Sequence, residues 1–335
     1  MGFSLIKYPA IDAKLKGMYA KQLSNTDLLE LIRQPDSISV ISSLKTKFKP
    51  LEFLKDDATR VETEDALDSV LIEDIKKIRI YLSEEEKKIF DIFISKYEIK
   101  CLKSVLKNLI SSSKIESNIT DVEAWTSTIF KNIEKILNVQ NVDEYLDAIK
   151  SSRYYLKISE LVNKENIPIF ELETSLDKEY FKILSKAVQG KSGTLKKIIG
   201  TRIDTLNLLW ILRLKKFYSL PVSKIEKLLI PVNYELKKSQ IKEIIEAEDY
   251  EEIQEILRKT YYQKLSYCDE NDIEQEIKIL LKHQYLSVLR QSKFDLSFVF
   301  SYIYLSEYQK SNIVHILGGI HYNFDKQEIE KRLII

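Results

Sequence analysis

Apolar residues recur along the chain at the spacing of an α-helix. Ile241, Ile244, Ile245, Ile253 and Leu257 fall mainly three or four positions apart, with Glu, Lys and Asp between them. That spacing places the apolar side chains in one stripe along a helix, whereas a half-buried strand would alternate at every second position. The helical period dominates the chain, and an all-α fold is therefore predicted.

Local signals predict where helices begin and end. Ser24 to Asp27 stand before the apolar Leu28, and Ser83 is followed by three consecutive glutamates. Small polar residues cap helix N-termini, and acidic residues in the first turn suit the positive end of the helix dipole. Since no long linker separates the segments, one compact assembly of helices is expected. Breaks are predicted at Pro35, Pro50, 111–113, Pro168, 190–193, Pro221 and Pro231.

A short motif repeats three times at a nearly constant period. It consists of an acid or amide, two residues, then Cys or Asn, then an aliphatic residue. The offsets between its first positions are 204 − 98 = 106 and 309 − 204 = 105. On a helix, positions three apart share one face, so each pair is expected to project from one side. The pairs are Glu98 with Cys101, Asp204 with Asn207, and Gln309 with Asn312.

A second, weaker block keeps nearly the same period. It begins at Leu44, Ile149 and Leu257, and the offsets between these starts are 149 − 44 = 105 and 257 − 149 = 108. Two blocks in the same order at a shared period indicate an internally repeated protein. The prediction is three similar helical lobes at 1–112, 113–220 and 221–335, in which the opening and closing elements of the first lobe mix with the C-terminus.

Composition narrows the fold class further. Gly and Pro together supply 7 + 6 = 13 of 335 residues, about 4%, against roughly 12% in average proteins. Strand-rich folds need these residues in their turns, so a sandwich, barrel or propeller is disfavoured.

Charge and cysteine content exclude several classes of protein. The net charge is only +1, whereas nucleic-acid binding usually leaves a basic excess. The two cysteines lie far apart, so free thiols are expected rather than a disulfide framework. No uncharged stretch reaches the roughly 20 residues of a membrane span, and the N-terminus carries no signal peptide pattern. A soluble, intracellular protein is the expectation.

Charge is unevenly distributed along the chain. Residues 178–216 carry ten basic and two acidic side chains, whereas 62–86 carry nine acidic and three basic ones. Solvated helix faces are the plainer interpretation, and electrostatic docking of partners is the alternative. The docking hypothesis assigns partner binding to Arg202, Arg213, Lys215 and Lys216.

No motif predicts catalysis, a metal site or a cofactor. Gly190, Lys191 and Ser192 imitate the end of a phosphate-binding loop, but the required first glycine is absent and a helix precedes them. The three histidines form no metal-binding pattern. In the aromatic segment 294–308, a helix core with tyrosine hydroxyls toward solvent is expected, with partner contact as the alternative.

The second repeat is the most telling part of the chain. Ile203-Asp204-Thr205-Leu206-Asn207-Leu208 is followed by Ile211-Leu212-Arg213-Leu214-Lys215, and the tail contains Ile316-Leu317-Gly318-Gly319-Ile320. In these segments, and in loose order over essentially its whole length, the chain resembles the C subunit of the V/A-type ATPases, whose eukaryotic relative is the d subunit. It departs from the family pattern at Gln309, where an acid is usual, and at Cys101, where Asn is usual.

The resemblance implies a fold and a role. Family members are non-catalytic sockets of three helical lobes around a central depression, with a funnel-like, pseudo-threefold shape. They join the central shaft, made of the D and F subunits, to the membrane ring of c-type subunits, and they pass on the torque that couples ATP to proton or sodium transport. The protein is thus expected to be peripheral, on the cytoplasmic side of the membrane, without a cofactor. The alternative is a generic helical scaffold of another assembly.

The resemblance also bears on the repeated motif. For Asp204 and Asn207 a structural role is expected, in which they satisfy polar groups where lobes meet. Direct contact with a partner is the alternative.

Overall fold

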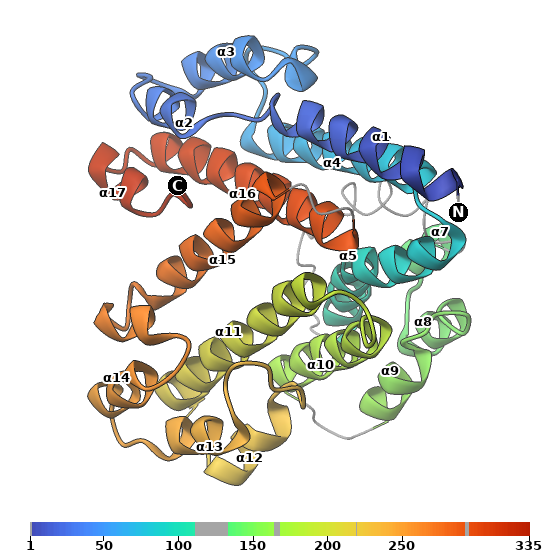
Figure 1. Ribbon diagram of the computed structural model, residues 1–335, viewed down its shortest axis with the longest axis vertical. Helices are drawn as coiled ribbons and strands as arrows, with labels where there is room; N and C mark the ends of the chain where they lie inside the picture. The colour runs from blue at the N-terminus through green and yellow to red at the C-terminus, as the bar shows by residue number, and fades with distance from the viewer. Residues whose placement is uncertain (1, 111–132, 164–167, 219, 292–294) are drawn as a thin grey trace. The chain divides into compact units, whose positions relative to one another are not determined.

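The regular structure in the described part of the chain is entirely helical. The computed structural model describes residues 2–110, 133–163, 168–218, 220–291 and 295–335, and it contains no strand there, which confirms the all-α prediction (Figure 1). The helices are α1 (Gly2–Tyr19), α2 (Asn25–Ile32), α3 (Ser37–Lys47), η1 (Lys49–Leu51), α4 (Arg60–Ile80), α5 (Glu84–Ile110), α7 (Ile133–Leu137), α8 (Val142–Ala148), α9 (Tyr155–Val162), α10 (Ile169–Ala187), α11 (Gly193–Tyr218), α12 (Val222–Leu228), α13 (Lys238–Glu246), α14 (Tyr250–Arg258), η2 (Gln263–Tyr267), α15 (Ile273–Arg290), α16 (Leu296–His321) and α17 (Lys326–Lys331), where η marks a 3₁₀ helix.

The chain folds into two compact units. The first unit combines Met1–Lys87 with Gln275–Ile335, and the second unit is the intervening Lys88–Glu274. The three lobes at 1–112, 113–220 and 221–335 stay a prediction, and the boundary between the first two lies outside the described residues.

Helix starts lie where the local signals place them. Ser24 Oγ accepts from Asp27 N at 3.1 Å, and the Asp27 carboxylate accepts from Ser24 N at 2.9 Å, which is a capping box at the start of α2. Ser83 and Glu86 form the same reciprocal pair before α5. Both predicted starts are confirmed. The break predicted at Pro50 lies between α3 and α4, and it contains the 3₁₀ helix η1.

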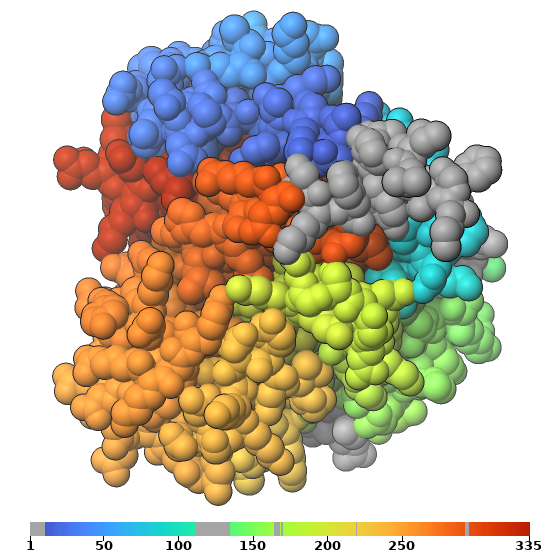
Figure 2. Space-filling view, viewed as in Figure 1, coloured from blue at the N-terminus to red at the C-terminus, as the bar shows by residue number. Residues whose placement is uncertain are grey.

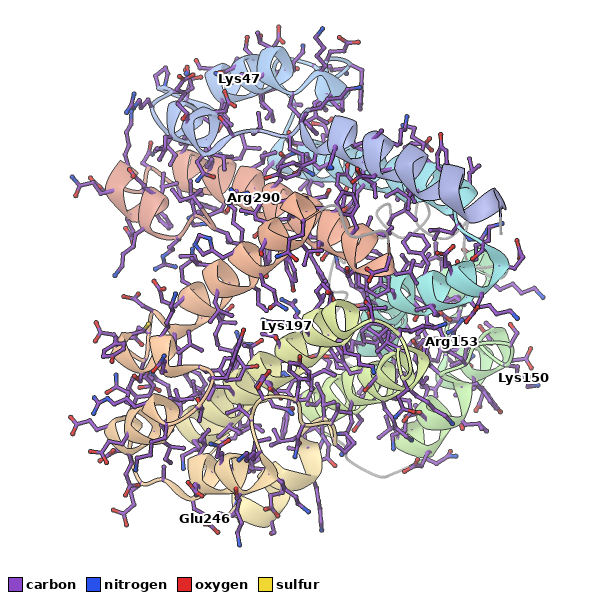
Figure 3. The ribbon with its side chains drawn as sticks, viewed as in Figure 1. Lys47, Lys150, Arg153, Lys197, Glu246 and Arg290 are labelled. Carbon is purple, nitrogen blue, oxygen red and sulfur yellow. The ribbon has the colours of Figure 1, made fainter. Side chains whose placement is uncertain are left out.

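The core of the first unit is built from both ends of the chain. Leu31, Val40 and Leu44 of α2 and α3 are fully buried together with Ile313 and Ile316 of α16. Figure 2 shows the N-terminal helices lying directly against α16 in this unit. Lys47 at the end of α3 adds ion pairs to Asp27 and Glu30 of α2, at 2.9 and 2.6 Å (Figure 3).

The aromatic segment of α16 is buried as well. Phe298, Phe300, Tyr302, Tyr304 and Tyr308 are at most 9% exposed, and Phe294 lies outside the described residues. The expectation that tyrosine hydroxyls point to solvent is wrong for Tyr302, whose hydroxyl donates to Asp74 of α4. Burial of an aromatic ring in a helical core favours a partner for its hydroxyl inside the protein.

The second unit packs long helices around α5 and α11. Phe90, Phe93 and Ile94 of α5 are fully buried, and Tyr180 of α10 donates from its hydroxyl to Phe93 O at 2.9 Å. Lys103 of α5 also pairs with Asp177 of α10 at 2.5 Å. Apolar contact and buried polar ties together fix α10 against α5.

Candidate functional site

The repeated motif lies on three long helices. Glu98 and Cys101 are on α5, Asp204 and Asn207 on α11, and Gln309 and Asn312 on α16. We call α5, α11 and α16 the motif helices. Cys101, Asp204, Asn207, Gln309 and Asn312 are all buried, so the repeat marks interior positions.

The two asparagines make the same unusual contact. Asn207 donates from Nδ2 to Ile230 O at 3.1 Å and accepts from Ile230 N at Oδ1, at 2.9 Å. Asn312 does the same with Ile334, at 3.1 and 2.8 Å. Ile230 closely follows α12, and Ile334 closely follows α17. Each side chain therefore pins the backbone that leaves a short helix, and we call this contact the Asn latch.

The first motif position also holds backbone. Asp204 accepts hydrogen bonds from the N–H groups of residues 234, 235 and 236 at 3.1, 2.7 and 2.9 Å, just before α13. Burial raises the pKa of its carboxyl, while the hydrogen bonds from these N–H groups act in the opposite direction. Gln309 Oε1 accepts from Leu23 N at 2.7 Å, just before α2. Gln309, at the position where an acid is usual, thus accepts from one backbone N–H group, whereas Asp204 accepts from three.

The first repeat is built differently. Glu98 accepts from Ser152 Oγ at 2.7 Å, and burial raises the pKa of its carboxyl. Cys101 is buried, and its surroundings raise the pKa of its thiol to about 12, chiefly because burial disfavours the thiolate. A thiol cannot offer the paired donor and acceptor of an amide, so Cys101 cannot form an Asn latch.

A hydroxyl that our sequence analysis missed precedes each motif by three residues. Ser95, Thr201 and Ser306 occupy this position, which the period of the repeat could have revealed. The Ser95 hydroxyl lies 2.7 Å from the hydroxyl of Tyr154, and Tyr262 donates to Asp204 at 2.9 Å.

In the first two repeats a tyrosine contacts the motif helix, and in the third repeat, whose motif helix is α16, a phenylalanine takes its place. Tyr154, Tyr262 and Phe48 each stand immediately before the short helix α9, η2 or η1. Phe48 has no hydroxyl, and Ser306 accepts from Gln22 Nε2 instead, at 2.7 Å.

The repeat extends to the helix caps. Asp36, Asn141 and Asp249 cap α3, α8 and α14, and each accepts from the N–H three residues on, at 2.7 to 2.9 Å. Their offsets are 141 − 36 = 105 and 249 − 141 = 108, the same as in the second sequence block. The short helices therefore follow the same period as the motif helices.

The basic residues proposed for partner binding differ in their surroundings. Arg213 and Lys216 have exposed side chains, and they pair with Glu274 at 2.5 Å and Glu270 at 3.3 Å. Lys215 donates to the carbonyl groups of Ile245 and Ala247 at the end of α13. Arg202 is half-buried. The structure thus brings Arg213 and Lys216 to one surface and turns Lys215 inward.

The remaining candidate features are the loop at Gly190, a metal site and a membrane span. Gly190 has φ 77° and ends α10, as expected of a helix-ending loop. Among the described residues, no group of three His, Cys, Asp or Glu side chains is placed to hold a metal ion. None of the helices there combines the length and apolar character needed to cross a membrane.

Comparison with known proteins gives the same family that the motifs suggest. Residues 11–332 match the ATP synthase (C/AC39) subunit family. The chain is 23% identical to a protein of Methanocaldococcus jannaschii named as the C subunit of an A-type ATP synthase, over all of this chain and 88% of that protein. Proteins of the same name from Methanosphaera stadtmanae and Methanococcoides burtonii are 24% and 23% identical, over 76% and 72% of this chain and 66% and 70% of theirs. The chain therefore belongs to the ATP synthase (C/AC39) subunit family.

Proposed function

We propose that this protein is the non-catalytic rotor socket of a V/A-type ATPase. In this role it joins the central shaft of D and F subunits to the membrane ring of c-type subunits, and it transmits torque for ATP-coupled ion transport. The observation that carries the proposal is the family match over residues 11–332, together with relatives named as the C subunit of an A-type ATP synthase. The protein would be peripheral, on the cytoplasmic side of the membrane.

The internal ties support a role that requires stiffness. A part that transmits torque must resist bending, and buried hydrogen bonds between a helix and a distant segment limit such bending. The Asn latches, the three N–H groups held by Asp204 and the Lys103–Asp177 pair are ties of this kind. Each of them connects segments of one unit that are separated in the sequence by at least one other helix or loop.

Binding of purified partners tests the proposal directly. We expect the full chain to co-purify with a D–F subcomplex and, separately, with detergent-solubilised c-ring. Binding to neither would leave a helical scaffold of another assembly as the better assignment. Binding to only one would contradict the role of a connector.

For the shaft contact we propose the surface formed by Arg202, Arg213, Lys215 and Lys216. Within it, Arg213 and Lys216 offer the exposed charges. Charge reversal of both, Arg213→Glu with Lys216→Glu, should weaken D–F binding at low salt, because electrostatic complementarity acts most strongly when it is least screened.

A charge-swapped control separates docking from folding. Reversing Arg213 also sets two acids against each other at Glu274, which could disturb the fold. The variant Arg213→Glu with Glu274→Arg keeps an internal ion pair and moves the positive charge to α15. If the double reversal binds D–F as tightly as the wild type at low salt, this surface is not the shaft contact.

A further inference from the structure

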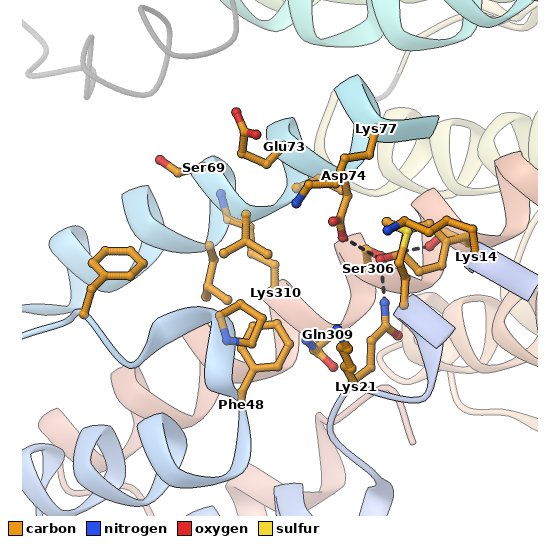
Figure 4. Close-up of a pocket in the computed structure, with 18 residues that line it drawn as sticks. Lys14, Lys21, Phe48, Ser69, Glu73, Asp74, Lys77, Ser306, Gln309 and Lys310 are labelled. Carbon is orange, nitrogen blue, oxygen red and sulfur yellow. Dashed lines mark hydrogen bonds between the residues drawn. The ribbon is translucent and has the colours of Figure 1, made fainter. Parts of the chain in front are cut away.

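A pocket of about 440 Å³ opens in the first unit between α1, α4 and α16 (Figure 4). Pockets that bind small molecules commonly have about 300–1,000 Å³ and are mostly apolar with a few polar groups. The proposed socket function assigns no role to this pocket. Its lining combines polar side chains that already have hydrogen-bond partners, apolar side chains and several lysine amines.

The polar wall of the pocket is already satisfied from inside the protein. Tyr302 donates to Asp74 at 2.5 Å, and Gln22 donates to Ser306 at 2.7 Å. Gln309 accepts from Leu23 N. A ligand that offered only hydrogen bonds would have to break these contacts, so the pocket favours a ligand with an apolar body.

The apolar side of the pocket can receive such a body. Phe53 stands at 66% exposure, and Met18 and Val70 are half-buried. Phe48 also lines the pocket, at the place where the other two repeats have a tyrosine whose hydroxyl bonds to the motif helix. The third repeat is thus more apolar at this position than its two counterparts.

Amines surround the pocket on two sides. Lys14 and Lys21 come from α1 and the residues after it, and Lys77 comes from α4 (Figure 4). None of the three makes an ion pair within the described residues, although all three act electrostatically on Asp74.

The remaining charges at the lining lie in ion pairs, with one carboxylate in excess beside Lys310. Lys310 is held by Asp68 at 2.5 Å and Glu64 at 3.3 Å, and Glu73 pairs with Lys76 at 3.0 Å. Three amines then face the single carboxylate of Asp74, which leaves positive charge at the rim of an apolar pocket.

We propose that this pocket binds a single aliphatic chain that carries an anionic head group. The chain lies against Met18, Phe48 and Val70, and the carboxylate or phosphate head lies among Lys14, Lys21 and Lys77. The inference does not depend on the socket role. A free fatty acid and an anionic lipid share this chemistry.

Calorimetric titration of the full chain with decanoate, below its aggregation concentration, tests the binding. We expect saturable binding of decanoate and weaker binding of decanol, which lacks the charge. Equal binding of decyltrimethylammonium, which carries the opposite charge, would overturn the proposal. Sedimentation with phosphatidylglycerol vesicles distinguishes the two sources. A protein that binds an anionic membrane lipid sediments with the vesicles, whereas a protein that binds only the free fatty acid does not. Failure of both decanoate and vesicles to bind would also overturn it.

Two variants locate the site. Lys14→Glu with Lys21→Glu changes exposed residues only and should weaken decanoate binding about tenfold or more, a change of roughly 1.4 kcal/mol. Lys224→Glu with Lys259→Glu alters the net charge equally at exposed positions of the second unit and should leave binding unchanged. Val70→Trp should fill the pocket and abolish binding, with circular dichroism to confirm the fold. If both the reversed and the filled variants bind decanoate normally, the ligand is elsewhere.

Discussion

At the scale of single residues, the Asn latch shows why the repeat requires an amide. The backbone of Ile230 presents a buried donor and a buried acceptor, and one amide side chain engages both, while the carbonyl also accepts from Val232 N at 2.8 Å. Aspartate offers acceptors alone, and serine is too short to reach both groups. The same requirement recurs at Ile334, which accounts for asparagine at both positions.

Removing a latch should therefore be costly. Asn207→Ala or Asn312→Ala leaves the N–H of Ile230 or Ile334 without a partner in the interior, whereas each carbonyl keeps a second donor, Val232 N at 2.8 Å or Lys282 Nζ at 3.0 Å. We expect each variant to lower the free energy of unfolding by about 1–3 kcal/mol. Urea denaturation measures the change. Asn163→Ala, at the exposed end of α9, is the matched control and should stay within about 0.5 kcal/mol of the wild type. If the latch variants are as stable as this control, the N–H groups of Ile230 and Ile334 find other partners.

Asp27 gives the first unit a defined pH dependence. Hydrogen bonds from Ser24 and Lys47 lower the pKa of its carboxyl to about 2 from an ordinary 3.8. Because the folded state binds the proton more weakly than the unfolded state, this stabilisation is complete above pH 3.8 and is lost as the pH falls towards 2.

Asp27→Asn should consequently destabilise the protein at neutral pH, by about 1 kcal/mol as for a lost helix cap. The difference between variant and wild type should shrink as the pH is lowered from about 4 towards 2. Chemical denaturation at several pH values measures it. A difference that does not change with pH would mean that the carboxylate charge contributes nothing.

The sequence located the motif residues but not what they bind. Spacing alone placed Asp204 and Asn207 on one helix face, because helical geometry is local. Their partners at 230 and 234–236 depend on how the chain returns to α11, which no local pattern encodes. For the same reason Lys215 was grouped with the exposed Arg213, although it holds the carbonyl groups at the end of α13.

At the scale of elements, one glycine sets how closely a loop approaches α11. A Cβ at Gly200 would lie 2.2 to 2.6 Å from three carbon atoms of the Tyr234 side chain. Tyr234 cannot easily retreat, since its N–H donates to Asp204. The close approach and the polar tie hold the loop at the same place.

Gly200→Ala should destabilise the protein although alanine is the better helix former. We expect a loss of about 1–3 kcal/mol from overpacking, measured by thermal or urea unfolding. Combining it with Tyr234→Gly, which removes all three obstructing carbon atoms, Cβ included, should restore most of the loss. Gly193→Ala meets no atom within 4 Å and serves as the control. A double variant no better than Gly200→Ala alone would contradict the steric explanation.

Element boundaries were well predicted where a cap or a breaker acts locally. Ser24 and Ser83 start their helices as expected. The break predicted at Pro50 separates α3 from α4, and it contains a 3₁₀ helix because a proline at the start of such a turn is compatible with its fixed φ. The short helices that follow Asp36, Asn141 and Asp249 share the period of the motif but have little sequence similarity, so their caps and the second sequence block are what reveal the relation.

At the scale of the whole molecule, the first unit depends on the last residues of the chain. Ile329, Leu333 and Ile334 are at most 3% exposed, and Gln275, Lys282 and Asn312 all donate to the carbonyl groups of residues 333 and 334. The tail is therefore part of a core rather than an appendage.

Deleting residues 326–335 should loosen the first unit selectively. We expect faster amide hydrogen exchange in peptides from 24–80 and 296–321, because their core loses its cover, while peptides from the second unit keep their protection. Mass spectrometry of the exchange measures this. Arg332→Ala, which removes only an exposed side chain in the same segment, should leave the pattern unchanged. Equal acceleration in both units would show that they unfold as one.

The joining of the two chain ends in one unit has a consequence for how the protein is made. Ribosomes release the N-terminal segment first, yet residues 1–87 complete their core only with 275–335, and the whole of 88–274 must be synthesised in between. At roughly 5–20 residues per second, the early helices wait about 12–50 s for residue 335, with their apolar faces uncovered. The second unit, whose segments are contiguous, can fold during synthesis. The first unit can be completed only after residues 275–335 have been made, so its exposed helices are where chaperones would act.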